Sequence, residues 1–162
     1  WIDLKYKYKV KGDKDYYFRT KELRKVKFPS YMNNKHMPPS YQYWKLSKFF
    51  DLYLLNKPTK YVEYLEDGIS RNKYNKYIVA PDNFAKYRYE IMDLIPNIKD
   101  KFINAIHFNS SITMGSIKFK PESIKNKIIV LLTKPLGYLL SKYIKLRANK
   151  SNNVSHNIND RT

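Results

Sequence analysis

The chain has 162 residues and a formal net charge of +18, from 32 Lys and Arg residues against 14 Asp and Glu residues. It contains no cysteine, which excludes a disulfide framework and a thiolate zinc site. Its residues are 43% hydrophobic and 16% aromatic, enough for the core of one domain, which excludes a wholly disordered chain.

The scarcity of carboxylates is the informative part of this charge. Codons rich in A and T favour Lys over Arg and make Gly rare, and the chain has only 4 Gly. Such codons nevertheless encode Asp and Glu, so a genome bias does not explain the missing acids. Because a surface with so many uncompensated cations repels itself, the composition predicts a polyanionic partner.

The N-terminal residues show the alternation of a strand. Ile2, Leu4 and Tyr6 fall on one side, and Lys5 and Lys7 fall on the other. This period of two predicts a half-buried strand over residues 1–10 with a basic outer row. Turn residues at 11–15 and an aromatic stretch at 16–20 predict a return strand, so we expect a β-hairpin.

A helical pattern follows an irregular connection at residues 29–39. Tyr43, Leu46, Phe50 and Leu54 recur at helical spacing after Ser40, a good N-cap residue. This pattern predicts a helix that begins at Ser40, ends before Pro58 and buries the four side chains together.

The second half of the chain mixes helical and strand periodicities. The elements predicted there are a helix at 60–67, a strand at 76–80, a helix at 82–94, an amphipathic segment at 98–106 and a strand at 112–120. Asp82 is expected to cap the second of these helices, whose apolar stripe is Phe84, Tyr87, Ile91 and Leu94. Residues 127–132 suit a helix and a buried strand equally well, and a helical stripe follows at 136–146.

The last residues are polar and lack apolar periodicity, which predicts a tail at 149–162 that is disordered in isolation. The sequence therefore predicts a single α+β domain over residues 1–148. It combines a small N-terminal β-hairpin with several amphipathic helices and a basic, partly extended C-terminal tail.

Two groups of cations are predicted to contact RNA phosphates. They comprise Lys5, Lys7, Lys9, Lys11, Arg19, Lys21, Arg24, Lys25 and Lys27 in the N-terminal part, and Lys142, Lys145, Arg147 and Lys150 near the C-terminus. Both groups also have structural explanations, since edge-strand lysines discourage aggregation and cations at a helix C-terminus complement its dipole. A third group with the same ambiguity is Lys118, Lys120, Lys125 and Lys127.

Aromatic residues are interleaved with the N-terminal cations. They are Tyr6, Tyr8, Tyr16, Tyr17 and Phe18. Unstacked bases can stack on such rings where the rings are exposed, and the alternative is that the rings are packed inside. Phosphate contact is the stronger of the two RNA predictions.

Candidates for catalysis are few. The clustered acids are Glu63, Glu66 and Asp67 in one segment, and Glu90 and Asp93 in another. Carboxylates at this helical spacing usually form a solvated face, and neighbouring lysines can neutralise them. The three histidines are isolated and no glycine-rich phosphate loop occurs. We therefore predict no enzymatic activity, no metal site, no cofactor and no small-molecule substrate.

The composition of the whole chain resembles that of ribosomal proteins from organelles or organisms with A+T-rich genomes. The resemblance implies a structural, rRNA-binding protein of a mitochondrial ribosome in the matrix, with rRNA and neighbouring ribosomal proteins as partners. Because it is a resemblance of composition, it carries over no residue role. The chain begins at Trp1 rather than Met, which is compatible with a removed targeting peptide.

Two other interpretations stay open. One is a matrix-facing accessory subunit of a mitochondrial membrane complex, which would be marked by a hydrophobic anchor or a basic amphipathic helix. No apolar run approaches the ~18 residues of a membrane span, so we expect none. The other is a nucleic-acid-processing enzyme, against which the lack of a convincing acid, metal or histidine cluster counts.

Overall fold

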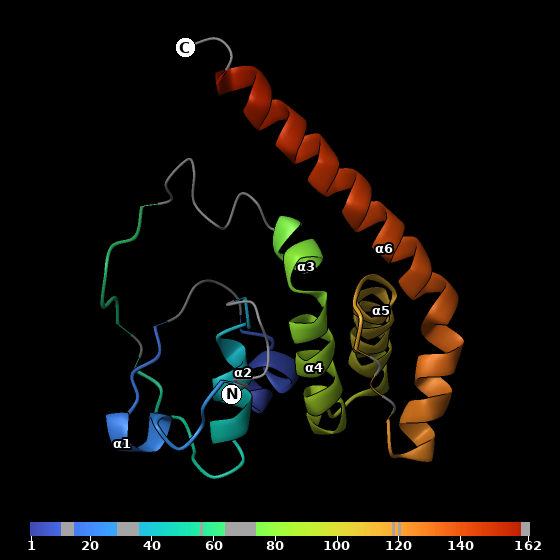
Figure 1. The fold of residues 1–162 in the computed structure, drawn as a ribbon. Helices are drawn as coiled ribbons and strands as arrows, with labels where there is room; N and C mark the ends of the chain where they lie inside the picture. Colours follow the sequence, from blue (N-terminus) through green and yellow to red (C-terminus); the bar gives the residue numbers. More distant parts are fainter. Residues whose placement is uncertain are drawn as a thin grey trace.

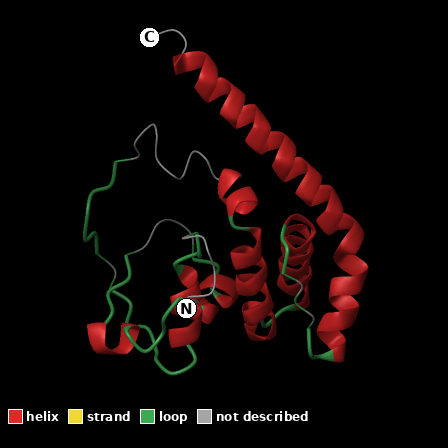
Figure 2. Cartoon of the chain, viewed as in Figure 1, coloured by secondary structure: helices red, strands yellow, loops and turns green. Residues whose placement is uncertain are grey.

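The computed structural model describes residues 1–10, 15–28, 36–55, 57–63, 74–117, 119 and 121–159, with side chains described as far as residue 149. All regular elements among these residues are helices joined by loops, and no strand occurs among them (Figure 2). The elements are η1 (Asp3–Lys7, a π-helix), α1 (Thr20–Leu23), α2 (Ser40–Leu46), α3 (Asn75–Val79), α4 (Pro81–Ile91), η2 (Met92–Leu94, a 3-10 helix), α5 (Ile98–Met114) and α6 (Ile124–Asn159). The predicted α+β class is therefore wrong.

The longer helices lie side by side, with α5 between α4 and α6 (Figure 1). The short elements η1, α1 and α2 lie on the other side of α4. Of the described helices, α6 is by far the longest, and its C-terminal part extends away from the rest of the molecule. It contains Pro135, which cannot donate a backbone hydrogen bond, and the orange part of α6 changes direction in Figure 1.

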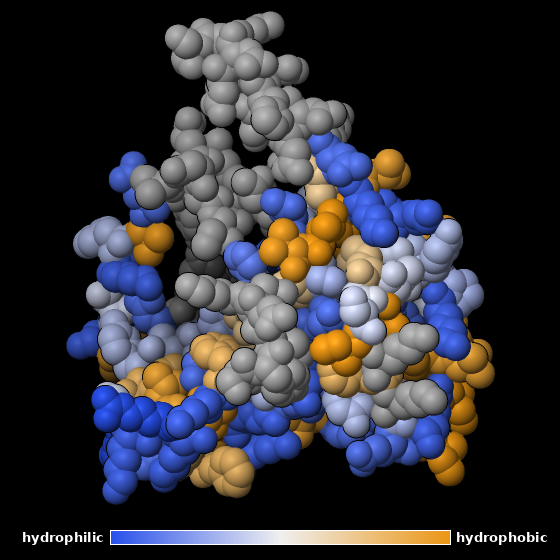
Figure 3. Space-filling view, viewed as in Figure 1, coloured by the Kyte–Doolittle hydropathy of each residue, from blue (hydrophilic) through white to orange (hydrophobic). Residues whose placement is uncertain are grey.

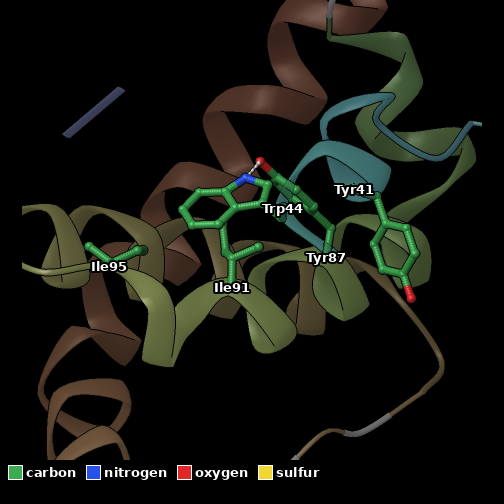
Figure 4. Close-up of a cluster of buried hydrophobic side chains, with 5 residues drawn as sticks. All are labelled: Tyr41, Trp44, Tyr87, Ile91 and Ile95. Carbon is green, nitrogen blue, oxygen red and sulfur yellow. Dashed lines mark hydrogen bonds between the residues drawn. The ribbon is translucent and has the colours of Figure 1, made fainter. Parts of the chain in front are cut away.

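Two apolar clusters hold these elements together. The first joins Tyr41 and Trp44 of α2 to Tyr87 and Ile91 of α4 and to Ile95, and the indole Nε1 of Trp44 donates to the Tyr87 hydroxyl at 3.0 Å (Figure 4). The second cluster joins η2, α5 and α6 through Met92, Ala105, Phe108, Ile129 and Val130. Burial of Phe84, Tyr87 and Ile91 confirms the apolar stripe predicted for this helix, whose fourth member Leu94 is half-buried.

The N-terminal β-hairpin is replaced by a turn of π-helix and an irregular segment. Trp1, Ile2 and Tyr6 pack against the first cluster, and the rings of Trp1 and Trp44 meet edge to face with centroids 4.9 Å apart. A two-stranded hairpin alone is marginally stable, whereas the helical turn places these side chains on one buried surface. The predicted turn at 11–14 lies outside the described residues.

The helix that begins at Ser40 is shorter than predicted. It ends at Leu46, and the Ser47 hydroxyl donates to the Trp44 carbonyl at 2.9 Å, a bond that favours the helix end. Leu46 is buried as predicted, but Phe50 and Leu54 are 44% and 66% exposed. The prediction that they are buried with it is wrong, because the chain leaves the helix before reaching them.

The helix predicted at 60–67 is wrong for residues 60–63, which are loop, and its remainder lies outside the described residues. Both strands predicted in the second half are also wrong. Residues 76–79 belong to α3, and residues 112–114 form the last turn of α5. A short apolar run does not distinguish a strand from a helix, and packing against α4 and α6 decides for the helix. Residues 127–132, left open between the two, are helical and lie in α6.

Asp82 does not cap its own helix but binds backbone groups that follow α5. The N-cap of α4 is Ala80, and the Asp82 carboxylate accepts from the backbone N–H groups of Ser116 and Ile117, each at 2.9 Å. A Cβ added at Gly115 would lie 2.2 Å from the Asp82 carboxylate, so the close approach requires glycine there. This contact ties the start of α4 to the end of α5.

The tail is helical as far as the structure describes it, since the backbone of residues 149–159 continues α6. The prediction of a partly extended tail is therefore wrong over these residues, while its disorder in isolation stays a prediction. No helix among the described residues is long and apolar enough to cross a membrane.

Candidate nucleic-acid interface

The N-terminal cations fall into two kinds. Lys7, Lys9, Arg19, Lys21, Arg24 and Lys27 are exposed, and none of them forms an ion pair within the described part of the chain. We call these six residues the free N-terminal cations. Four of them lie on or next to α1, at the edge of the molecule where hydrophilic side chains dominate in Figure 3.

Lys5 and Lys25 are engaged within the protein. The Lys5 ammonium lies over the rings of Trp1 and Trp44, 5.1 and 5.9 Å from their centroids. Although much of the side chain is exposed, burial of this ammonium, with a smaller contribution from Arg88, lowers the pKa of Lys5 to about 8. Lys25 pairs with Glu22 and lies over the Phe50 ring. Both are weaker candidates for phosphate contact than predicted, and Lys11 lies outside the described residues.

Only part of the aromatic set is available for base stacking. Tyr16 and Phe18 pack on Tyr43 of α2, with ring centroids 4.5 and 5.2 Å from it. Tyr6 packs on Trp44. Among the predicted rings, Tyr8 and Tyr17 are exposed at 62% and 76%.

Sequence reasoning missed a second source of exposed rings. The segment 47–55, predicted as helix, is turn and loop, and Phe49 and Tyr53 are 75% and 91% exposed in it. Lys48, which directly precedes Phe49, is also exposed. Sequence reasoning missed these rings because the helical spacing of Leu46, Phe50 and Leu54 predicted a helix through this segment.

The C-terminal cations lie on the other side of the molecule. Lys142, Lys145 and Arg147 are exposed on α6, and the Arg147 Nε donates to the Tyr143 hydroxyl at 3.1 Å. Lys150 continues the same helix, and its side chain lies outside the description. Because α1 packs on α2 whereas α6 packs on α5 and α3, the two predicted groups are not brought together (Figure 1).

The third group is split. Lys125 and Lys127 are exposed in the first turn of α6, and Lys118 and Lys120 lie outside the described residues. From residue 124 to 159 the sequence of α6 contains Lys and Arg but neither Asp nor Glu. The residues of α6 that carry a full charge are therefore all cations, and they end at Lys150.

Neighbouring side chains engage both acids of the second cluster, Glu90 and Asp93. Glu90 accepts from Lys86 at 2.7 Å and also pairs with Lys45. Burial by itself raises the pKa of Glu90, but the hydrogen bonds from Lys45 and Lys86 outweigh it and hold this pKa below its ordinary value. Asp93 accepts from the Asn126 amide at 2.5 Å. The two lysines therefore neutralise Glu90, whereas Asp93 is held by a neutral amide.

The remaining candidate acids form no metal site among the described residues. Glu63 is exposed, Glu66 and Asp67 lie outside the described residues, and no group of three or more potential metal ligands occurs in the described part of the chain. A hollow of about 180 Å³ beside Glu90 is lined by Asp93 and Glu122 as well as by Lys45 and Lys48. Its mixed charge does not favour a phosphate.

Comparisons with protein-family models, with curated proteins and with solved structures found no match for this chain.

Proposed function

We propose that the protein is a structural RNA-binding component of a ribonucleoprotein particle and, in the finer form of the proposal, a mitochondrial ribosomal protein that contacts rRNA. The observation that carries the proposal is the set of free N-terminal cations, which are exposed without a carboxylate partner within the described chain. Each such cation can pair with a phosphate and release condensed counterions, which favours binding without sequence preference.

The engaged acids support a structural role over an enzymatic one. Glu90 holds Lys45 and Lys86, and Glu22 holds Lys25, so these carboxylates serve the fold. Phosphate contact requires no chemistry from them. The exposed rings of Tyr8 and Tyr17 add places where an unstacked base can lie.

The salt dependence of RNA binding tests the proposal. If all six free N-terminal cations meet phosphates of single-stranded RNA, the slope of log K against log[salt] is roughly −4, from about 0.7 per phosphate. The Lys21→Gln/Lys27→Gln variant should reduce the steepness of this slope by about 1.4. The matched control is Lys25→Gln, which removes a cation that is already paired and should change the slope less.

Two outcomes would contradict phosphate contact by this surface. One is an affinity for RNA that does not depend on salt. The other is a loss of slope in Lys25→Gln as large as the loss per substituted lysine in Lys21→Gln/Lys27→Gln. The finer proposal is tested on the native protein. It should co-sediment with rRNA from a mitochondrial extract, and ribonuclease should release it; sedimentation unaffected by ribonuclease would refute it.

A further inference from the structure

The helix α6 carries a row of large aliphatic side chains that is open to solvent. The row consists of Ile128, Leu132, Leu136, Leu139 and Leu146, which are between 51% and 71% exposed. Their spacing places them on one side of the helix. The row is about 27 Å long at about 1.5 Å per residue. Apolar residues along the edge of the molecule formed by α6 are visible in Figure 3.

The opposite side of α6 packs on α5 through small and polar residues at its centre. Thr133, Gly137 and Ser141 are buried there, and a Cβ added at Gly137 would lie 2.3 Å from the Asn109 Cβ. The Asn109 amide donates to the Val130 carbonyl at 2.8 Å and to the Thr133 hydroxyl at 3.0 Å. Ile129, Val130 and Ile144 are buried on this same side, so the aliphatic row on the outer side is additional to the residues that α6 contributes to the core.

The charge of α6 restricts what can cover the row. Lys125 and Lys142 are exposed on this helix, which contains no acid from residue 124 to 159. Pairing of two copies through α6 would bring these cations together without compensation, which disfavours a dimer. An RNA would satisfy the cations and leave the aliphatic row in water.

An anionic bilayer surface satisfies both features. The aliphatic row can enter the boundary between headgroups and acyl chains while lysines reach the lipid phosphates. Each cation held near such a surface gains from its negative potential. A convex helical ridge needs no complementary groove when its partner is a fluid bilayer.

We propose that α6 lies along the surface of an anionic lipid bilayer, with Ile128, Leu132, Leu136, Leu139 and Leu146 inserted. The helix does not cross the bilayer in this arrangement, in keeping with the absence of a spanning helix among the described residues. The α1 region lies on the other side of the molecule (Figure 1). The proposal goes beyond RNA binding and does not depend on it, because the free N-terminal cations stay accessible.

Flotation of the full chain with vesicles, in the absence of RNA, tests the proposal. The protein should float with vesicles of phosphatidylcholine and phosphatidylglycerol and much less with phosphatidylcholine alone. The Leu132→Ser/Leu139→Ser variant should bind the anionic vesicles at least about tenfold more weakly, since two inserted aliphatic side chains are lost.

The matched control is Leu131→Ser/Tyr138→Ser. These residues have the same separation along α6 and are similarly exposed, at 61% and 51%, but they lie about 100° around the helix from Leu132 and Leu139. This control should retain most of the binding, and circular dichroism should show both variants folded. Equal losses in the two variants, or no flotation with anionic vesicles, would overturn the proposal. A concentration-dependent dimer that only Leu132→Ser/Leu139→Ser abolishes would also overturn it and assign the row to a second copy.

Discussion

Trp44 is the residue around which the N-terminal part of the chain assembles. Its ring is 1% exposed, donates to the Tyr87 hydroxyl and meets the rings of Trp1 and Tyr6. Phe50 lies four residues after Leu46, where α2 ends, and therefore does not reach the same cluster. The two aromatic residues therefore differ greatly in what they contribute to stability.

We expect Trp44→Ala to lower the free energy of unfolding by about 3–5 kcal/mol, because the substitution opens a cavity in the first cluster and removes a buried hydrogen bond. Phe50→Ala should cost less than about 1 kcal/mol, since that ring is 44% exposed. Urea unfolding of both variants gives the comparison. A larger loss for Phe50→Ala than for Trp44→Ala would mean that α2 extends to residue 54 in solution.

His107 makes stability depend on pH. Burial, aided by the nearby Arg88 guanidinium, lowers the pKa of His107 from an ordinary 6.5 to about 4. Below pH 6.5 the unfolded chain binds a proton that the folded chain does not, so the folded state loses stability as the pH falls towards 4. The pKa of Glu90 is lowered by its ion pairs, so its contribution to the stability of the folded state is lost only at a lower pH than that of His107.

The loss attributable to His107 between pH 7 and pH 5 should be about 2 kcal/mol. It is measured as the difference between the wild type and His107→Gln, in which this titration is absent, by urea unfolding at the two pH values. Parallel pH dependence of the two proteins would show that His107 is solvated in the folded state.

At the scale of elements, the contact between α5 and α6 depends on a close approach of two backbones. Gly137 allows it, because any side chain there would meet Asn109 and the Ile106 carbonyl. The Asn109 amide then bonds across the interface. The same closeness leaves the aliphatic row of α6 on the outside.

Gly137→Ala should therefore destabilise the protein by about 1–3 kcal/mol through overpacking. In a solvent-exposed helix the same change would stabilise by about 1 kcal/mol, so the sign is diagnostic. Leu139→Ala, on the exposed side of the same helix, is the control and should have an effect within about 0.5 kcal/mol. Urea unfolding measures both, and a stabilising Gly137→Ala would mean that α5 and α6 are further apart.

At the scale of the whole molecule, the net charge of +18 is not spread evenly. The free N-terminal cations lie on and around α1 and η1, and a second set of exposed cations lies along α6 from Lys125 to Arg147. In Figure 1 these surfaces occupy opposite sides of the helical core. The two proposed partners, RNA and an anionic bilayer, would therefore not compete for one surface.

Charge reversal separates an assembly protein from an enzyme. Reversing Lys7, Lys21, Arg24 and Lys27 to Glu should prevent recovery of the protein in sedimented ribonucleoprotein particles, since each reversed site adds repulsion from phosphate. Neutralising the exposed acids Asp51, Glu63 and Glu122 should leave recovery unchanged or slightly raise it. Loss of the second variant from the particles, with normal recovery of the first, would refute the electrostatic account.

Some features were predictable from the sequence alone because they are sums over residues or long periodic patterns. Net charge and the lack of a membrane-spanning helix among the described residues belong to the first kind. The stripe of Phe84, Tyr87 and Ile91 belongs to the second, since an amphipathic helix of this length buries one face wherever it packs. The neutralisation of clustered acids by nearby lysines was also foreseen, and Lys86 does pair with Glu90.

The tertiary structure decided which secondary structure the short segments adopt. Residues 1–10 alternate like a strand, yet no second strand pairs with them among the described residues, and Trp44 provides a surface that Trp1, Ile2 and Tyr6 reach from a helical turn. It also decided that Lys5 is engaged, because packing brings the Trp44 ring to it from 39 residues away. The pairing of Lys25 with Glu22, by contrast, is a local contact between residues three apart. Charge is a property of composition, whereas exposure and pairing depend on which neighbours the fold brings within a few ångströms, and local periodicity carries no information about those neighbours.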